Sequence, residues 1–221
     1  MSNVTLQPSD QDAYVDSGAP TNTYGTVDPD NLIVGEYNSA ADRYLRTLIQ
    51  FDLSSIPSVA TITLATLSLY YYAKDTGTSW SNTLATLRVT SSWNESTVTW
   101  NTTPSVNGSW IGYTTCTQAT SYGWVSISLS ASIMTAIING TYTNYGFMVL
   151  DGNSNANNAM KFYSSEYSTT TVRPKLYLEY TLPSGSQPAI SPFFNFFKNF
   201  ENPWKRKGGI WQPNKKGLVT I

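Results

Sequence analysis

The 221-residue chain contains no histidine and a single cysteine, Cys116. Without histidine there is no Ser-His-Asp triad, no imidazole base that titrates near neutral pH and no histidine-bearing zinc site. One cysteine can form neither an intrachain disulfide framework nor a thiolate metal cage. These absences exclude several classes of enzyme and metal site before any motif is considered.

Charge is also scarce. Charged residues make up 12% of the chain, about half the usual share, and Ser and Thr supply about a quarter of it. The net charge of −1 gives no whole-chain electrostatic case for binding nucleic acid. We therefore expect no nucleic-acid partner.

Long hydrophobic runs are missing as well, since no apolar stretch approaches the roughly 18 residues that cross a bilayer. Residues 1–8 have neither the basic nor the apolar region of a secretory signal peptide. We expect a protein that is assembled inside a cell or whose signal has been removed, and that ends on a virion or at an extracellular surface.

What the chain does contain, from about Val4 to Leu182, is a series of short runs rich in β-formers. Turn clusters such as Asp75-Thr76-Gly77 and Asp151-Gly152-Asn153 separate them. This pattern predicts an all-β sandwich or barrel as domain 1–182. The clearest strands are expected at 45–51, 63–71, 85–90, 124–129, 145–150 and 175–181.

One short internal helix is expected at 131–138. Ser130 is a suitable N-cap, and Asn139-Gly140 provides the stop. Ile133, Met134 and Ile137 would then face the core.

Beyond Leu182 the composition changes. Residues 183–191 have the composition of a linker, and 192–221 form an aromatic and basic C-terminal extension. The extension carries six basic residues and one acid, a net charge of +5, which leaves seven basic and 13 acidic residues, a net −6, on the remainder. The near-neutral net charge of the whole chain is therefore the sum of a negatively charged body and a positively charged C-terminal extension.

The extension is predicted to be an anchoring arm. Ser191-Pro192 favours a helix start, and Asn202-Pro203 would end the helix. Its aromatic side chains hold one helical face, and basic residues follow; the predicted partner-binding residues are Phe193, Phe196, Phe197, Phe200, Trp204, Lys205, Arg206, Lys207 and Trp211. We favour docking on another protein over packing on the chain's own body or lying on a membrane surface.

Several stretches of the body also carry a family resemblance. In chain order they are Asp12-Ala13-Tyr14-Val15, Asn22-Thr23-Tyr24-Gly25, Leu32-Ile33-Val34-Gly35, Leu48-Ile49-Gln50-Phe51-Asp52-Leu53-Ser54-Ser55-Ile56-Pro57, Ala65-Thr66-Leu67-Ser68-Leu69, Trp93-Asn94-Glu95-Ser96-Thr97-Val98-Thr99-Trp100-Asn101, Gly123-Trp124, Asn139-Gly140, Asn144-Tyr145-Gly146-Phe147, Phe162-Tyr163-Ser164-Ser165-Glu166 and Arg173-Pro174-Lys175-Leu176. Over residues 10–181 the chain resembles the DNRLRE-type domain, also classed as carbohydrate-binding module family 96.

The resemblance implies a jelly-roll-like antiparallel β-sandwich that is usually one module of a secreted or surface protein, and some members bind polysaccharide. Two features depart from the family. Ser128-Leu129-Ser130 stands where the family usually has Asp-Val-Thr, so a carboxylate is missing. The chain is also a single module with its own C-terminal arm.

A catalytic role is not expected. Glu95, between Trp93 and Trp100, could form a glycosidase pair with Glu166 or Asp52. We favour the interpretation that the tryptophans pack and that Glu95 orders a loop, because spacing alone does not make two carboxylates converge.

Calcium is the one cofactor considered. Asp10, Asp12, Asp16, Asp28 and Asp30 lie in turn-like surroundings and offer the oxygen ligands that Ca²⁺ prefers. Their spacing matches no defined calcium loop, so we favour solvated turn carboxylates.

Exposed aromatic rings are the expected platform for sugars. Neighbouring residues of a strand point to opposite faces, so the run Tyr70-Tyr71-Tyr72 must expose at least one ring. The predicted glycan-binding residues are Tyr71, Trp80, Trp110 and Tyr113. The net −6 of the body favours neutral glycans over polyanionic ones.

Two functions remain open. The first is a non-catalytic structural protein, a β-sandwich displayed on a virion surface, decoration or tail assembly or present as a homo-oligomer, anchored by residues 192–221 and able to contact host glycans. The alternative is a carbohydrate-binding module of a secreted or cell-surface polysaccharide-degrading system.

Overall fold

The computed structural model describes residues 1–37, 42–74, 81–153, 158–183, 204–207 and 210–213, the last two ranges by their backbone alone. The chain divides into two compact units, residues 1–182 and 183–221. Each unit is described by itself.

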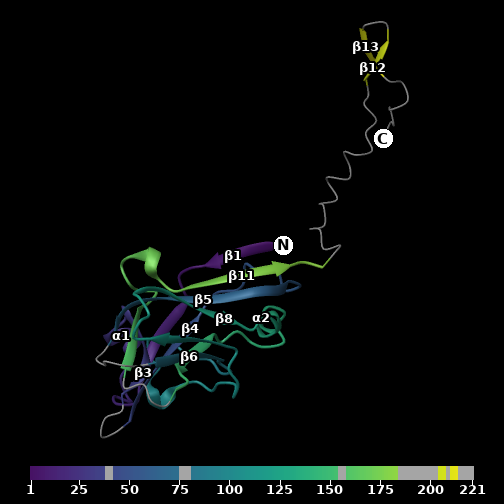
Figure 1. Cartoon of the computed structure of the whole chain (residues 1–221). Helices are drawn as coiled ribbons and strands as arrows, with labels where there is room; N and C mark the ends of the chain where they lie inside the picture. Colours follow the sequence, from purple (N-terminus) through teal and green to yellow (C-terminus); the bar gives the residue numbers. More distant parts are fainter. Residues whose placement is uncertain (38–41, 75–80, 154–157, 184–203, 208–209, 214–221) are drawn as a thin grey trace. The chain divides into compact units, whose positions relative to one another are not determined.

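The first unit is built on one antiparallel sheet of eleven strands (Figure 1). The strands are β1 (Ser2–Leu6), β2 (Gln11–Asp16), β3 (Asn31–Tyr37), β4 (Arg43–Gln50), β5 (Thr61–Lys74), β6 (Ser81–Arg88), β7 (Gly112–Thr117), β8 (Gly123–Leu129), β9 (Phe147–Asp151), β10 (Asn158–Tyr163) and β11 (Lys175–Thr181). The all-β prediction is confirmed, and each of the six expected strands overlaps an observed one.

The sheet closes on itself. Its hydrogen-bonded order runs β5-β10-β3-β4-β9-β6-β7-β8, and β8 pairs with β5 again. These eight strands form a closed barrel, so their pairing does not divide into the two separate sheets of a sandwich. Strand β2 pairs with β4, and β11 and β1 extend the sheet beyond β5.

Period-two alternation decides which side chains fill the barrel. Along β8, Val125, Ile127 and Leu129 are buried, whereas Trp124, Ser126 and Ser128 are exposed. The core inside the ring therefore takes alternate residues of the ring strands, among them Leu67, Leu69, Tyr71, Phe147 and Phe162, together with Phe51 just after β4.

The internal helix α2 (Ala131–Ile138) forms where the sequence places it. The Ser130 hydroxyl accepts a hydrogen bond from the Ile133 backbone N–H, as an N-cap does. Met134 and Ile137 are buried in the core, and Ile133 packs partly against it. This prediction is confirmed.

Three short helical turns were not predicted: α1 (Tyr24–Val27), η1 (Trp100–Thr102) and η2 (Thr170–Val172). They are three or four residues long, which is too short for a hydrophobic period to mark them.

The second unit contains a two-stranded antiparallel hairpin, β12 (Trp204–Lys207) and β13 (Ile210–Pro213), in which Arg206 lies opposite Trp211. The helical position expected for Trp204 is wrong, because this residue begins a strand. A proline at position 203 disfavours a helix that continues through Trp204, and the sequence Gly208-Gly209 favours a tight strand connection. Phe193, Phe196, Phe197 and Phe200 lie outside the described residues.

The arm's predicted docking on a partner stays a prediction. Among the residues that the structure describes, no helix has both the length and the apolar character needed to cross a membrane.

Because the barrel and its core lie wholly within the first unit, residues 1–182 should fold without the arm. We expect a chain truncated after Leu182 to keep the far-UV circular dichroism of the body and to melt within a few degrees of the full chain. A truncated chain that is unfolded would show that the arm contributes to the core.

Candidate functional site

A row of aromatic rings crosses the outside of three strands. Trp124 of β8 lies directly opposite Tyr70 of β5, with ring centroids 5.3 Å apart in an edge-on contact. Tyr163 of β10 stacks on Tyr70 at 5.9 Å, and Tyr167 stacks on Tyr163 at 3.7 Å. Tyr72 also stacks on Tyr163, at 4.2 Å. These five residues are called the aromatic row; Trp124 is 38% exposed and the tyrosines are partly exposed.

The alternation of inward-facing and outward-facing side chains along β5 explains which tyrosines belong to the row. Leu69 and Tyr71 point into the barrel, so Tyr70 and Tyr72 point out. Tyr71 is 1% exposed and packs against Phe162, so its proposed role as a sugar platform is wrong. The alternation argument was right that the triplet exposes a ring.

Polar side chains lie beside the row on the same outer face. Strand register places Lys175 of β11, Ser68 of β5 and Ser126 of β8 side by side. The Ser68 and Ser126 hydroxyls are 3.0 Å apart, and the Lys175 Nζ lies 3.7 Å from the centroid of a Trp124 ring. The face therefore offers rings, hydroxyls and one ammonium group within a few strands.

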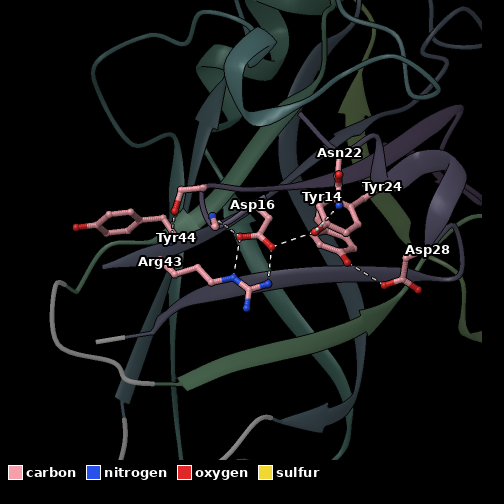
Figure 2. Close-up of polar contacts among 9 residues, drawn as sticks. Tyr14, Asp16, Asn22, Tyr24, Asp28, Arg43 and Tyr44 are labelled. Carbon is pink, nitrogen blue, oxygen red and sulfur yellow. Dashed lines mark hydrogen bonds and ion pairs between the residues drawn. The ribbon is translucent and has the colours of Figure 1, made fainter. Parts of the chain in front are cut away.

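Hydrogen bonds hold one end of the row in place. The Tyr72 hydroxyl donates to Asn31 Oδ1, and Asn31 Nδ2 donates to Asp28 Oδ1 at 2.6 Å. Asp28 Oδ2 also accepts from the Tyr14 hydroxyl at 2.9 Å (Figure 2). This chain of hydrogen bonds fixes the orientation of the Tyr72 ring through its hydroxyl group.

A second exposed pair lies on β7 and the loop before it. Trp110 and Tyr113 are 48% and 61% exposed, with ring centroids 5.9 Å apart. Both were predicted as glycan contacts, and both are accessible. The other tryptophan predicted as a glycan contact, Trp80, lies outside the described residues.

With this geometry in place, the comparison with known families is decisive for the assignment. Residues 2–180 match carbohydrate-binding module family 96. The chain belongs to this family. The family is one of non-catalytic binding modules, and the match covers almost the whole first unit. A search of curated proteins finds no match.

In this family 96 module, sequence analysis missed Trp124, Tyr163, Tyr167 and Lys175. Trp124 and Tyr163 lie in stretches that carried the family resemblance, but nothing in a single sequence says that β5, β8 and β10 are neighbours. The alternation of β8 marks Trp124 as outward-facing, and that signal was available.

Two of the candidate calcium ligands, Asp28 and Asp16, are occupied by protein donors (Figure 2). Asp28 accepts the bonds from Tyr14 and Asn31 described above. Asp16, fully buried, accepts from the Gly18 N–H and the Arg43 Nε at 2.8 Å each, and from the Tyr24 hydroxyl at 3.1 Å. Arg43 Nη2 completes a two-pronged ion pair with the carboxylate. Burial raises the pKa of Asp16, but the bonds and charge of Arg43 outweigh it and hold this pKa below its usual range.

Of the other three candidates, Asp10 and Asp30 are exposed, whereas Asp12 belongs to a carboxylate cluster that sequence spacing did not predict. Oxygen atoms of Asp12, Glu95 and Glu166 all lie within 4.8 Å of one another. The Ser9 hydroxyl and the Ser165 N–H donate to Asp12, whereas Glu95 Oε1 is buried without a hydrogen-bond partner.

Two acids of the cluster, Asp12 and Glu95, have raised pKa values. Burial raises the pKa of Asp12 to about 7; the hydrogen bond from Ser9 opposes this rise, and the charge of Glu166 adds to it. Burial, Glu166 and Asp12 raise the pKa of Glu95 to about 8. These oxygens lie closer together than the carboxyl groups of an inverting glycosidase, which are about 6.5–9.5 Å apart. Asp52 is engaged elsewhere, with Ser54.

Asp16 is the buried partner of an ion pair, so we expect Asp16→Ala to lower the free energy of unfolding. The loss should be about 3 kcal/mol, the low end for a broken buried pair, because the Arg43 side chain is 45% exposed and stays solvated. Urea denaturation measures it. Asp30→Ala, which removes an exposed carboxylate, is the control; equal losses for both would contradict the role of the pair.

The free energy of unfolding should fall as pH rises from about 4 to about 8. In the folded chain Asp12 and Glu95 keep their protons over most of this range, whereas in the unfolded chain the same carboxyls release them near pH 4. We expect Glu95→Gln to reduce this slope and to raise the melting temperature relative to wild type at pH 9 more than at pH 5. The control is Glu179→Gln on β11, outside the cluster. If the pH dependence of the melting temperature is the same in Glu95→Gln as in wild type, Glu95 is not the source of that dependence.

Proposed function

We propose that this chain is a non-catalytic module that binds polysaccharide through the aromatic row. The observation that carries the proposal is the run of adjoining rings from Trp124 through Tyr70 to Tyr163 and Tyr167, partly exposed on the outer face of the barrel. Membership of family 96 supports the same function independently.

The chemistry suits a sugar. A pyranose ring has an apolar face that stacks on an aromatic ring and hydroxyls at its edge that need hydrogen-bond partners. The exposed Trp124 ring supplies the first, and Ser126 and Lys175 beside it supply the second. The Tyr163 ring is stacked between Tyr72 and Tyr167 and so supports the row. Because mutual stacking and the Asn31 bond hold the rings before any ligand arrives, little conformational entropy is lost on binding.

The distribution of charge bears on which sugar binds. Four of the seven basic residues of the body lie on β5, β10 and β11 or just before β11: Lys74, Lys161, Arg173 and Lys175. The preference for neutral glycans rested on the net −6 of the whole body, but the face that carries the row is locally richer in positive charge. Carboxylated sugars therefore belong in the test beside neutral ones.

Strand pairing supports the finer, jelly-roll description of the fold. Among the eight ring strands, the first pairs with the last (β3 with β10), the second with the seventh (β4 with β9), the third with the sixth (β5 with β8) and the fourth with the fifth (β6 with β7). Such nested pairs arise when a long hairpin is rolled up, which is the wrapping of a jelly roll.

Of the two functions left open by the sequence, the family assignment favours the carbohydrate-binding module. No finding supports a virion, a protein shell or a homo-oligomer. We infer an extracellular or cell-surface setting, where polysaccharide is met, and the arm 192–221 as the segment that links the module to its larger context.

Binding should be measured by affinity electrophoresis and calorimetry against soluble neutral and carboxylated polysaccharides. We expect retardation by at least one of them. We expect Trp124→Ala to weaken binding about tenfold, the loss typical of a central aromatic contact. Tyr163→Ala should weaken binding less, because this ring is stacked between Tyr72 and Tyr167 and acts by supporting the row.

The matched control is Tyr44→Ala, which removes a ring that is 36% exposed on β4, outside the row. All variants should keep the wild-type melting profile within a few degrees. No binding to any glycan, or equal losses at Tyr44 and Trp124, would refute the proposal.

A further inference from the structure

The outer face of β8 joins the aromatic row to the Trp110–Tyr113 pair. Alternation sends Trp124, Ser126 and Ser128 outward, and all three are exposed. At the far end, Ser128 lies directly opposite Tyr113 of β7. A line of exposed side chains therefore runs from Trp124 over two serine hydroxyls to Tyr113.

Contacts with the rest of the protein hold the Trp110–Tyr113 pair in place. The Trp110 ring lies against Gly152, where a Cβ would come within 2.6 Å of Trp110 Cζ2. The loop before it is tied down, since Asn107 Oδ1 accepts from the Arg88 N–H at 2.6 Å and Asn107 Nδ2 donates to the Ser109 carbonyl at 2.8 Å. Both rings nevertheless remain about half exposed or more.

We propose that the outer face of β8 is an extended subsite, and that the ligand is a linear glycan long enough to reach from the aromatic row to Trp110 and Tyr113. This inference rests on the proposed function and specifies it. The row holds one stretch of the chain, the Ser126 and Ser128 hydroxyls contact the middle, and the Trp110–Tyr113 platform stacks on a second stretch.

The length of the path sets the class of ligand. Trp124 and Ser128 are four strand residues apart, about 13 Å, and Tyr113 lies one strand spacing further, about 5 Å. That span exceeds one or two pyranose rings. The module therefore takes segments of a polysaccharide and not mono- or disaccharides, and its affinity grows with chain length until both platforms are filled, as in bivalent binding.

The test is a ladder of oligosaccharides, from disaccharide to octasaccharide, cut from whichever polysaccharide retards the full chain. We expect calorimetric affinity to rise with length by about tenfold or more in total before it levels off. Tyr113→Ala and Trp110→Ala should weaken the longest oligosaccharides about fivefold to tenfold and leave the shortest unchanged, whereas Trp124→Ala should weaken every length.

Two controls keep the result specific. Ser128→Ala removes a hydroxyl of the path without changing a ring, and it should weaken long ligands only. Tyr44→Ala removes an exposed ring off the path and should weaken none. Melting profiles check that Trp110→Ala, which uncovers Gly152, still folds. If it does not, Tyr113→Ala alone tests the platform, because Tyr113 is the more exposed ring.

The outcomes separate the two proposals. Loss at Trp124 with full affinity in Tyr113→Ala and Trp110→Ala at every length would overturn the extended subsite and keep the aromatic row. Affinity that is already complete with a disaccharide would do the same. Absence of any glycan binding by the wild-type chain would refute the proposed function itself.

Discussion

The pairing of β5 with β8 is the constraint on which the rest of the structure depends. Strands β10 and β11 occupy the other edge of β5, so the β8 pairing turns an open sheet into a closed ring. The same six-residue register that closes the core around Leu67 and Ile127 places Tyr70 against Trp124 on the outside. Stability and the candidate binding face are therefore two sides of one strand pair.

Closure places the largest hydrophobic cluster inside the ring. Smaller buried clusters lie on the other side of β3, β4 and β9, whereas the outer face of β5 and β8 is left to polar and aromatic residues. The long strand β5 shows this most clearly, since Leu67, Leu69 and Tyr71 face the core while Thr66, Tyr70 and Tyr72 face out. A shift of one residue in its register would exchange the two sets. The core thus fixes which rings can meet a ligand, and no separate binding loop is required to orient them.

Buried polar groups divide into two kinds. Asp16 is saturated by donors and by Arg43, so it ties the end of β2 to the start of β4. Asp12, Glu95 and Glu166 instead bring three acids together with one buried oxygen left without a partner. Burial raises the pKa of Asp12 and of Glu95. Sequence analysis treated Asp12 and Asp16 alike because both follow the same turn-rich pattern. Their chemistry differs because only one of them meets an arginine.

Local rules were enough for everything that depends on neighbours in the chain. The β-class, the helix at 131–138 with its Ser130 cap, the outward ring within Tyr70-Tyr71-Tyr72 and the family resemblance all follow from short-range pattern and composition. Which strands pair does not, because backbone hydrogen bonds between strands are the same for any sequence and only the packed core selects among registers. Tertiary structure therefore decided that Trp124, Tyr70 and Tyr163 form one row, that Tyr71 is buried, and that Asp12 meets Glu95 and Glu166.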